Sequence, residues 1–202
     1  MAEEAPRLVL ASRSSARSLL LRRAGIAFDV DAASLDEEAV KLAMKAEGAT
    51  AMDAAATLAA LKAERVCARH PGVLVVGADQ ILDCGGQWFD KPTDAEHLRA
   101  HLTALRGREH RLETAVCVAR DGAVIWHDGD SATLTMRPFS DQFLDGYLVA
   151  AGPEALESVG GYRLEGPGAQ LFSRIDGDFF TILGLPLLPL LAFLRGHGIG
   201  VE

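Results

Sequence analysis

Cysteine is scarce in this sequence of 202 residues, and its three cysteines are widely separated. Cys67, Cys84 and Cys117 form no CxxC pair. An odd number of scattered cysteines argues against a disulfide framework or a zinc knuckle, and it favours a reducing compartment. The N-terminus also lacks a basic segment followed by a long apolar run, so we predict no signal peptide and a cytoplasmic location.

The sequence also has few long hydrophobic runs and fewer basic than acidic residues. The most apolar stretch, residues 179–194, is interrupted by Pro186 and Pro189 and is too short to span a membrane, so we expect it in the core. Lys and Arg number 20 against 28 Asp and Glu, which gives a net charge of −8. A chain this acidic is a poor candidate for binding a nucleic-acid backbone, although a few converging cations could still bind a small anion. We therefore predict neither a membrane nor a nucleic-acid partner.

Apolar patterning and turn signals predict alternating strands and helices in one domain, or in two small lobes that share a core. The expected strands are 8–11, 73–76, 110–119, 123–136, 169–175 and 179–183. The expected helices are about 16–24, 37–48, 50–69, 93–107, 140–151 and 187–195. Capping-box patterns open two of these helices, with Thr50 before Asp53 and Thr93 before Glu96. Strand–helix units together with a hairpin signal at residues 121–122 predict an α/β fold with a mixed sheet and flanking helices.

Several familiar motifs are absent. There is no GxxxxGK[ST] sequence, and the glycines between 160 and 168 do not fit GxGxxG. His97 and His101 have helical spacing but lack the glutamate of a zinc protease, so we expect partly exposed helix residues. The acidic turns at 128–130 and 176–178 could hold a cation, but turn chemistry alone explains them.

Five polar elements fall where chemistry is common in α/β proteins. The segment from Ser12 to Arg17 joins a strand to a helix N-terminus, where backbone N–H groups and the helix dipole suit a phosphate. Asp79 follows a buried strand, the place where α/β proteins tend to carry active sites. Lys91 lies on a loop before a helix, Lys62 lies in an apolar helix, and residues 36–37 are an acidic pair. Each element alone also has an ordinary interpretation as a turn residue or a solvated side chain.

The order of these elements resembles the Maf family of nucleoside triphosphate pyrophosphatases over nearly the whole chain. The matching segments are Leu8-Val9-Leu10-Ala11-Ser12-Arg13-Ser14-Ser15-Ala16-Arg17, Asp36-Glu37, Lys62-Ala63, Gly77-Ala78-Asp79-Gln80, Lys91-Pro92, Leu105 to His110 with Thr114, and Gly177-Asp178 with Gly184-Leu185-Pro186-Leu187. The departures are Ser15 for a usual proline, Leu19 for a usual acidic residue, Asp90 for a common glycine, and Ser158. None of these departures removes a charged residue of the expected site.

The resemblance implies one domain over residues 1–202, built as two lobes around a central cleft, and often a homodimer. It implies hydrolysis between the α- and β-phosphates of a nucleoside triphosphate, with Asp79 as the general base. Ser12, Arg17, Lys62 and Lys91 would then bind the phosphates. Hard oxygen ligands suit Mg²⁺ or Mn²⁺, and Glu37 with Asp79 are the natural candidates to hold such a cation.

Two branches of the family differ at three positions, which here are Ala16, Gln80 and Glu165. This set is similar to the branch that acts on 7-methyl-GTP. A carboxylate at 165 can accept hydrogen bonds from both guanine donors, N1–H and N2–H₂, and a negative charge suits a methylated, cationic base. Ala16 leaves room for a two-ring base. The alternative interpretation of Glu165 is a loop charge beside Gly166.

Three alternatives stay open at this point. The protein could be a pyrophosphatase for dTTP and UTP. It could be a nucleotide-binding regulator of cell division that keeps the cations but activates no water. It could also be a triphosphatase that cuts at the γ-phosphate and releases orthophosphate.

Overall fold

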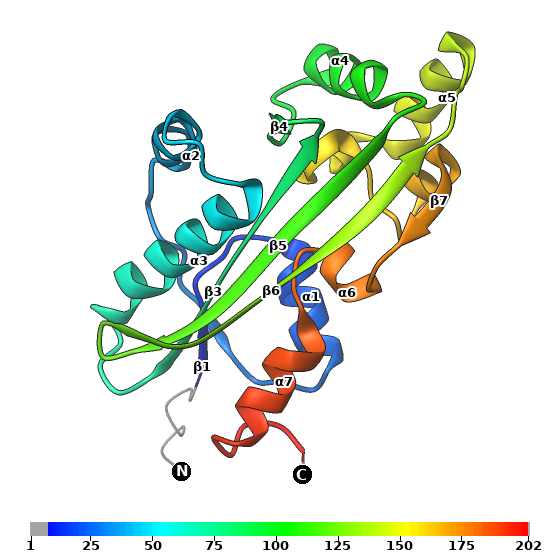
Figure 1. The fold of residues 1–202 in the computed structure, drawn as a ribbon. Coiled ribbons are helices and arrows are strands. Elements are labelled where there is room, and N and C mark those ends of the chain that lie inside the picture. Colours follow the sequence, from blue (N-terminus) through cyan, green and yellow to red (C-terminus); the bar gives the residue numbers. More distant parts are fainter. Residues whose placement is uncertain (1–7, 202) are drawn as a thin grey trace. The chain divides into compact units, whose positions relative to one another are not determined.

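The computed structural model describes residues 8–201, drawn as a ribbon in Figure 1. Its seven-stranded sheet has the order β2-β1-β3-β5-β6-β7, and β4 pairs with β3. The strands are β1 (Leu8–Leu10), β2 (Asp29–Val30), β3 (Leu74–Cys84), β4 (Gln87–Phe89), β5 (Glu109–Arg120), β6 (Ala123–Met136) and β7 (Phe172–Asp176). The pairs β1–β2 and β1–β3 are parallel, whereas β3–β4 and β6–β7 are antiparallel. The predicted α/β fold with a mixed sheet is therefore confirmed.

Seven α-helices and three short 3₁₀ helices accompany the sheet in the described part of the chain. The α-helices are α1 (Ser15–Arg23), α2 (Glu37–Ala46), α3 (Ala51–Cys67), α4 (Ala95–Leu105), α5 (Asp141–Ala151), α6 (Phe179–Ile182) and α7 (Leu187–Arg195). The 3₁₀ helices are η1 (Pro153–Glu157), η2 (Val159–Gly161) and η3 (Pro167–Leu171). Within residues 8–201, no helix has the length and apolar character needed to cross a membrane. The prediction about a signal peptide depends on residues 1–7, which lie outside the described residues.

The chain forms two compact units, which share the long strands β3, β5 and β6 by continuity of the backbone. The first unit comprises the described residues up to Asp79, Thr114–Asp130 and the residues from Gly184 onward, and the second comprises Gln80–Glu113 and Ser131–Leu183. The single-domain organisation and the cleft that the resemblance implies stay predictions.

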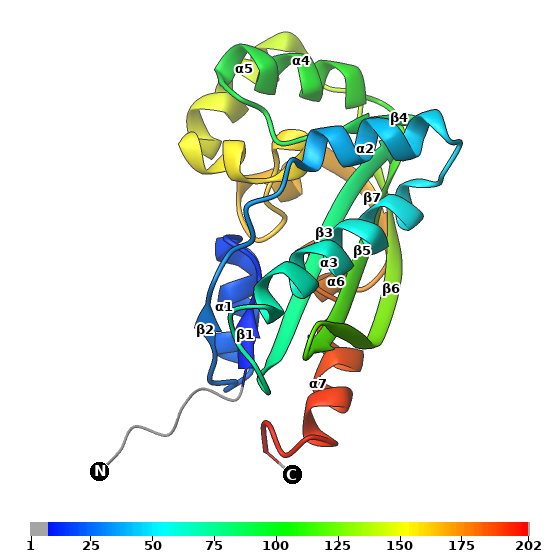
Figure 2. The ribbon, with the colours of Figure 1, turned by 90° about the vertical axis from the view of Figure 1, so that its left-hand side faces the viewer.

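In the first unit, α3 packs closely on β3, and Figure 2 shows α3 in front of that strand. A Cβ atom at Gly77 of β3 would lie 2.1 Å from the backbone oxygen of Ala59, so only glycine permits this approach. The buried face of α3 includes Ala55, Leu58 and Ala63. The predicted capping box is present at its start, where Thr50 and Asp53 each accept a hydrogen bond from the other's backbone. This packing brings the middle of α3 against the first half of β3.

The second unit has a core of its own. Leu82, Leu102, Leu134, Leu144 and Leu171 are fully buried within it. They come from β3, α4, β6, α5 and η3, so segments far apart in sequence close around one apolar centre.

Several expectations about local structure are wrong. The strand expected over 169–175 begins only at Phe172, and residues 169–171 belong to η3. Helix α4 is capped by Asp94, whose side chain accepts a hydrogen bond from the backbone of His97 at 2.8 Å, and Thr93 lies outside the helix. Aspartate caps a helix as well as threonine does, and two adjacent candidates cannot be separated by pattern. Residues 179–182 form helix α6, because Asp178 accepts hydrogen bonds from two backbone N–H groups and starts a helical turn. His101 is buried, with its ring edge-on to that of Phe89 at 5.1 Å.

The expected hairpin is confirmed. Asp121 and Gly122 have φ values of 52° and 82°, the positive pair that a two-residue turn between antiparallel strands requires. Residues 128–130 lie within β6 instead of in a turn. In the described part of the chain, no group of three or more His, Cys, Asp and Glu side chains is arranged to hold a metal.

Candidate active site

Asp79 lies within β3, and the expectation that it follows the end of a strand is wrong. The strand continues through Gln80 to Cys84, and the buried residues Ile81 and Leu82 extend its apolar pattern beyond the polar pair. Asp79 is only 7% exposed. A carboxylate buried in this way needs a partner, because an isolated charge is costly away from water.

Lys62 of α3 supplies that partner. Its Nζ is 2.6 Å from Oδ1 of Asp79 and 3.0 Å from Oε1 of Glu37. The Lys62 side chain is 9% exposed, so the ordinary interpretation of a solvated helix lysine is wrong. The close approach of α3 to β3 at Gly77 places the ammonium beside the aspartate. One cation is thus held between two carboxylates that are far apart in sequence.

Glu37 is the first residue of α2, and the preceding Asp36 is its N-cap. The Asp36 side chain accepts a hydrogen bond from the backbone of Ala39 at 3.0 Å. This cap fixes where the helix begins and so where the Glu37 side chain leaves it. The two acidic residues therefore have different roles. Asp36 caps the helix, and Glu37, with a side chain that is 43% exposed, forms an ion pair with Lys62.

Arg17 lies on α1 and is buried, although α1 is otherwise rich in exposed basic residues. Its Nε donates to the backbone oxygen of Gly184 at 2.7 Å, and its Nη1 donates to Oγ of Ser12 at 3.1 Å. Ser14 is the N-cap of the helix and accepts from the backbone of Arg17. Strand β1, helix α1 and the segment before α7 thus hold one guanidinium in a fixed orientation.

Burial and charge act on these groups in opposite directions. Burial raises the pKa of Asp79, while Lys62 and Arg17 oppose the rise. Burial lowers the pKa of Arg17, and Asp79 with Glu37 counteract it. The four side chains therefore form one electrostatic cluster, in which two cations balance two carboxylates. Together with Ser12, we call these residues the Lys62 cluster.

The remaining expected phosphate ligand, Lys91, belongs to the second unit. It lies on the exposed loop between β4 and α4, followed by the buried Pro92. That Lys91 acts together with the Lys62 cluster stays a prediction.

The three expected base-specificity residues have different local environments. Ala16 is half-buried in the first turn of α1. The amide nitrogen of Gln80 donates to the backbone oxygens of Thr181 at 2.9 Å and Ile182 at 3.3 Å, at the end of α6. Oε1 of Glu165 accepts a hydrogen bond from Nε of Arg163 at 2.9 Å. Their role in base recognition stays a prediction.

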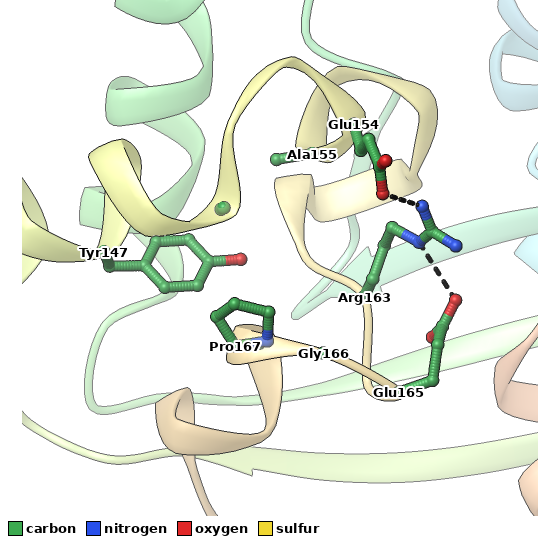
Figure 3. Close-up of a pocket in the computed structure, with 9 residues that line it drawn as sticks. Tyr147, Glu154, Ala155, Arg163, Glu165, Gly166 and Pro167 are labelled. Atoms are coloured by element: carbon green, nitrogen blue, oxygen red, sulfur yellow. Dashed lines mark hydrogen bonds and ion pairs between the residues drawn. The ribbon is translucent and has the colours of Figure 1, made fainter.

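Glu165 lines a cavity of about 130 Å³ in the second unit, shown in Figure 3. Tyr147 of α5, Glu154 of η1 and Pro167 of η3 contribute to its walls. Figure 3 shows Arg163 between the carboxylates of Glu154 and Glu165, bonded to both. The cavity is smaller than the roughly 300–1,000 Å³ typical of small-molecule sites, so it does not enclose a whole nucleotide.

Comparison with known proteins identifies the family. Residues 7–197 match the family described as "Maf: Maf-like protein". This chain belongs to the Maf family. The resemblance in the sequence motifs is thereby confirmed.

Maf relatives with similar sequences carry two kinds of name. The chain is 58% identical over 190 residues to a protein of Paramagnetospirillum magneticum named nucleoside triphosphate pyrophosphatase, covering 94% of this chain and 98% of the relative. It is 48% identical over 193 residues to a 7-methyl-GTP pyrophosphatase of Rhizobium etli, covering 96% and 97%. A 7-methyl-GTP pyrophosphatase of Brucella abortus is 49% identical over 189 residues, covering 94% and 95%.

The donor set of this Maf chain fits a divalent cation only in company with substrate. Glu37 and Asp79 both face the same ammonium, so they converge on one place that already accommodates positive charge. Two carboxylates are too few for a cage built from protein alone, and the described residues offer no larger acidic group there. Mg²⁺ usually binds one or two carboxylates together with substrate phosphates and water, and that is the chemistry this pair suits.

Some contributors to the site have roles that sequence reasoning missed. The backbone oxygen of Gly184 fixes Arg17, and the missing side chain of Gly77 lets α3 approach. Both glycines lie in motifs typical of the Maf family, but a motif does not say which atom acts. Arg163 and Glu154 were not candidates at all. The only local signal was the presence of opposite charges two residues apart, at 163 and 165.

Proposed function

We propose that this Maf protein is a nucleoside triphosphate pyrophosphatase, a hydrolase that cleaves the bond between the α- and β-phosphates. The products are a nucleoside monophosphate and pyrophosphate. The observation that carries the proposal is the Lys62 cluster, in which buried cations and carboxylates meet in one place. The names of the relatives from Paramagnetospirillum magneticum and Rhizobium etli support it.

The cations of the cluster suit the charge of the substrate. A triphosphate is a polyanion that repels an incoming nucleophile, and fixed positive groups lower that repulsion. Arg17 presents a guanidinium whose orientation is set by Ser12 and Gly184. Lys62 presents a compact ammonium that is held between Asp79 and Glu37. Lys91 adds a third positive charge in this proposal.

Asp79 takes the role of general base. It accepts a proton from the water whose oxygen attacks one phosphorus of the α–β anhydride, and the bond to the bridging oxygen breaks as the other phosphate product leaves. Burial raises the pKa of Asp79, which makes its carboxylate a better proton acceptor than an exposed one. A divalent cation held by Glu37 and Asp79, Mg²⁺ or Mn²⁺, would supply further neutralisation of the phosphate charge. A carboxylate engaged by such a cation is less basic, so Glu37 is the better candidate for the larger share of cation binding.

Release of pyrophosphate tests the proposal. We expect Asp79→Asn to lower turnover by about 10²–10⁴-fold, the range of general-base catalysis. Glu64→Gln is the matched control, because Glu64 is an exposed acid on α3 close in sequence to Lys62. Near-normal turnover by Asp79→Asn would reject the base role. Nucleotide binding without any product would favour a regulator, and orthophosphate in place of pyrophosphate would favour a γ-cleaving enzyme.

For the base, we propose guanine nucleotides, with 7-methyl-GTP preferred. Glu165 supports this because a carboxylate accepts from both guanine donors, whereas thymine and uracil offer one donor between two acceptors. A panel of GTP, 7-methyl-GTP, dTTP and UTP decides between these substrates. Faster cleavage of dTTP or UTP than of any guanine nucleotide would reject the assignment. A cytoplasmic location and a homodimer stay predictions.

A further inference from the structure

Arg163 divides its donors between two carboxylates. Its Nε donates to Oε1 of Glu165 at 2.9 Å, and its Nη1 pairs with Oε2 of Glu154. A guanidinium can bind one carboxylate with two parallel hydrogen bonds, which would occupy both oxygens of Glu165. The bond to Glu165 is a single one from Nε to Oε1, while Nη1 pairs with Glu154. Each carboxylate oxygen has two acceptor positions, so Oε2 and the second position of Oε1 remain for two further donors.

The backbone of Arg163 is closely packed against η3. A Cβ atom at Gly168 would lie 2.4 Å from the backbone oxygen of Arg163 and 2.8 Å from its nitrogen, so η3 is in close contact with this residue. On the other side of the segment, the Tyr147 hydroxyl donates to the backbone oxygen of Gly161 at 3.0 Å. The segment between η2 and η3 is therefore fixed at both ends.

The three charged groups that line the cavity, Glu154, Arg163 and Glu165, have a net charge of −1, and Glu157 adds a weaker negative influence on Arg163. The side chains of Arg163 and Glu165 are 29% and 30% exposed, so they are screened less than freely exposed groups, whereas Glu154 is 68% exposed. The hydrogen bond with Glu165 raises the pKa of Arg163, so the guanidinium is charged at every working pH. A net negative charge with acceptor positions left on both oxygens of Glu165 suits a group that donates two hydrogen bonds and carries positive charge.

We propose that Arg163 is a positioning residue that sets base preference through Glu165, with Glu154 holding Arg163 in its shared arrangement. The inference rests on the proposed function, in which Glu165 contacts the base. Arg163 orients the Glu165 carboxylate toward the two guanine donors, and the shared pairing preserves the net negative charge that favours a methylated, cationic base.

Orientation and charge can be measured separately. Hypoxanthine lacks the N2 amino group, so the ratio of kcat/KM for GTP over ITP reports the orientation of the carboxylate. The ratio of kcat/KM for 7-methyl-GTP over GTP reports local charge. A residue needed only for folding would lower the turnover of every substrate alike and leave both ratios unchanged.

We expect Arg163→Gln to lower the GTP over ITP ratio by about tenfold, the order of one charge-assisted hydrogen bond. The same variant raises the 7-methyl-GTP over GTP ratio by about threefold at low salt, because the local charge becomes −2, and added salt reverses the gain. Arg163→Lys keeps the charge but lacks the planar fork, so only the GTP over ITP ratio falls. Glu154→Gln leaves a net charge of zero and shifts the 7-methyl-GTP over GTP ratio downward.

Arg174→Gln is the matched control, because Arg174 is an arginine of the same unit that is 74% exposed. It should leave both ratios unchanged. If Glu165→Gln abolishes base preference while Arg163→Gln and Arg163→Lys leave both ratios as in the wild type, this proposal is overturned and the proposed function stands. If Glu165→Gln leaves the ranking of bases unchanged, the base assignment fails and the inference falls with it. If the wild type releases no pyrophosphate from any nucleotide, both are rejected.

Discussion

Replacing Lys62 with methionine removes the cation that joins Asp79 to Glu37 while keeping most of the apolar stem. The Nζ to Oδ1 distance of 2.6 Å and side-chain exposures of 9% and 10% describe a buried, hydrogen-bonded ion pair between Lys62 and Asp79. Removing one partner of such a pair typically costs about 3–5 kcal/mol, because the other charge stays buried without compensation. For a chain of this size, that loss lowers Tm by roughly 6–20 °C.

A double-mutant cycle separates the pair from the packing around it. Lys62→Met leaves Asp79 as an excess negative charge, whereas the further change Asp79→Asn restores the balance between Arg17 and Glu37. We therefore expect the double variant to be more stable than the sum of the single losses predicts, by about 2 kcal/mol, within the range for directly contacting groups. Urea unfolding of the four proteins at one pH measures the coupling.

Arg65→Met is the control, because Arg65 is an exposed basic residue on the same helix. It should change stability by less than about 0.5 kcal/mol. The reasoning is refuted if Lys62→Met is no more destabilising than Arg65→Met, or if the losses in the cycle simply add. Either result would mean that Lys62 and Asp79 are not a compensated buried pair.

Burial lowers the pKa of His110 to about 4, so the unfolded chain takes up this proton first, and the His110 contribution to stability should fall by about 3 kcal/mol as pH drops from 6.5 to 4. Urea unfolding should show a loss of stability over this range that is about 3 kcal/mol larger in the wild type than in His110→Gln, because other groups with lowered pKa values, such as His101, contribute equally to both proteins. Gly77→Ala should cost about 2 kcal/mol, because its Cβ would lie 2.1 Å from a backbone oxygen of α3, whereas Gly146→Ala, with nothing within 4 Å, should be neutral or stabilising in the same thermal melts. In Arg17→Lys, the ammonium cannot reproduce the planar guanidinium that donates to the backbone oxygen of Gly184. Steady-state kinetics should therefore show a KM for the triphosphate that is about tenfold higher, and an unchanged KM would contradict a phosphate-binding role.

Local patterning was sufficient for most of the fold, because the decisive signals lie within a few residues. The hairpin needs positive φ at residues 121 and 122, and the aspartate-glycine pair supplies it. The sequence pattern gave a wrong secondary structure where two local signals favoured different elements. A short apolar run such as 179–183 is compatible with either a strand or a helix. The Asp178 side chain accepts hydrogen bonds from two backbone N–H groups, and this cap stabilises the helix.

The membership of the site was predictable, but its energetics were not. The motif resemblance named Lys62, Asp79 and Glu37, and the structure brings all three together. That Lys62 is buried depends on how closely α3 approaches β3, which is set by the missing side chain at Gly77 and not by the sequence around the lysine. In the same way, nothing local to Glu165 shows that Arg163 shares its charge with Glu154.

The charge balance of the Lys62 cluster constrains how a triphosphate can bind. Arg17 and Lys62 are already balanced by Asp79 and Glu37, so the cluster has no net positive charge for a polyanion. The Lys62 ammonium can turn toward a phosphate only if another positive charge compensates the carboxylates that it leaves, because both partners would otherwise be uncompensated and Asp79 is deeply buried. Substrate must therefore arrive with its own counter-cations. This requirement gives a physical reason for two carboxylates in a site whose task is to bind an anion.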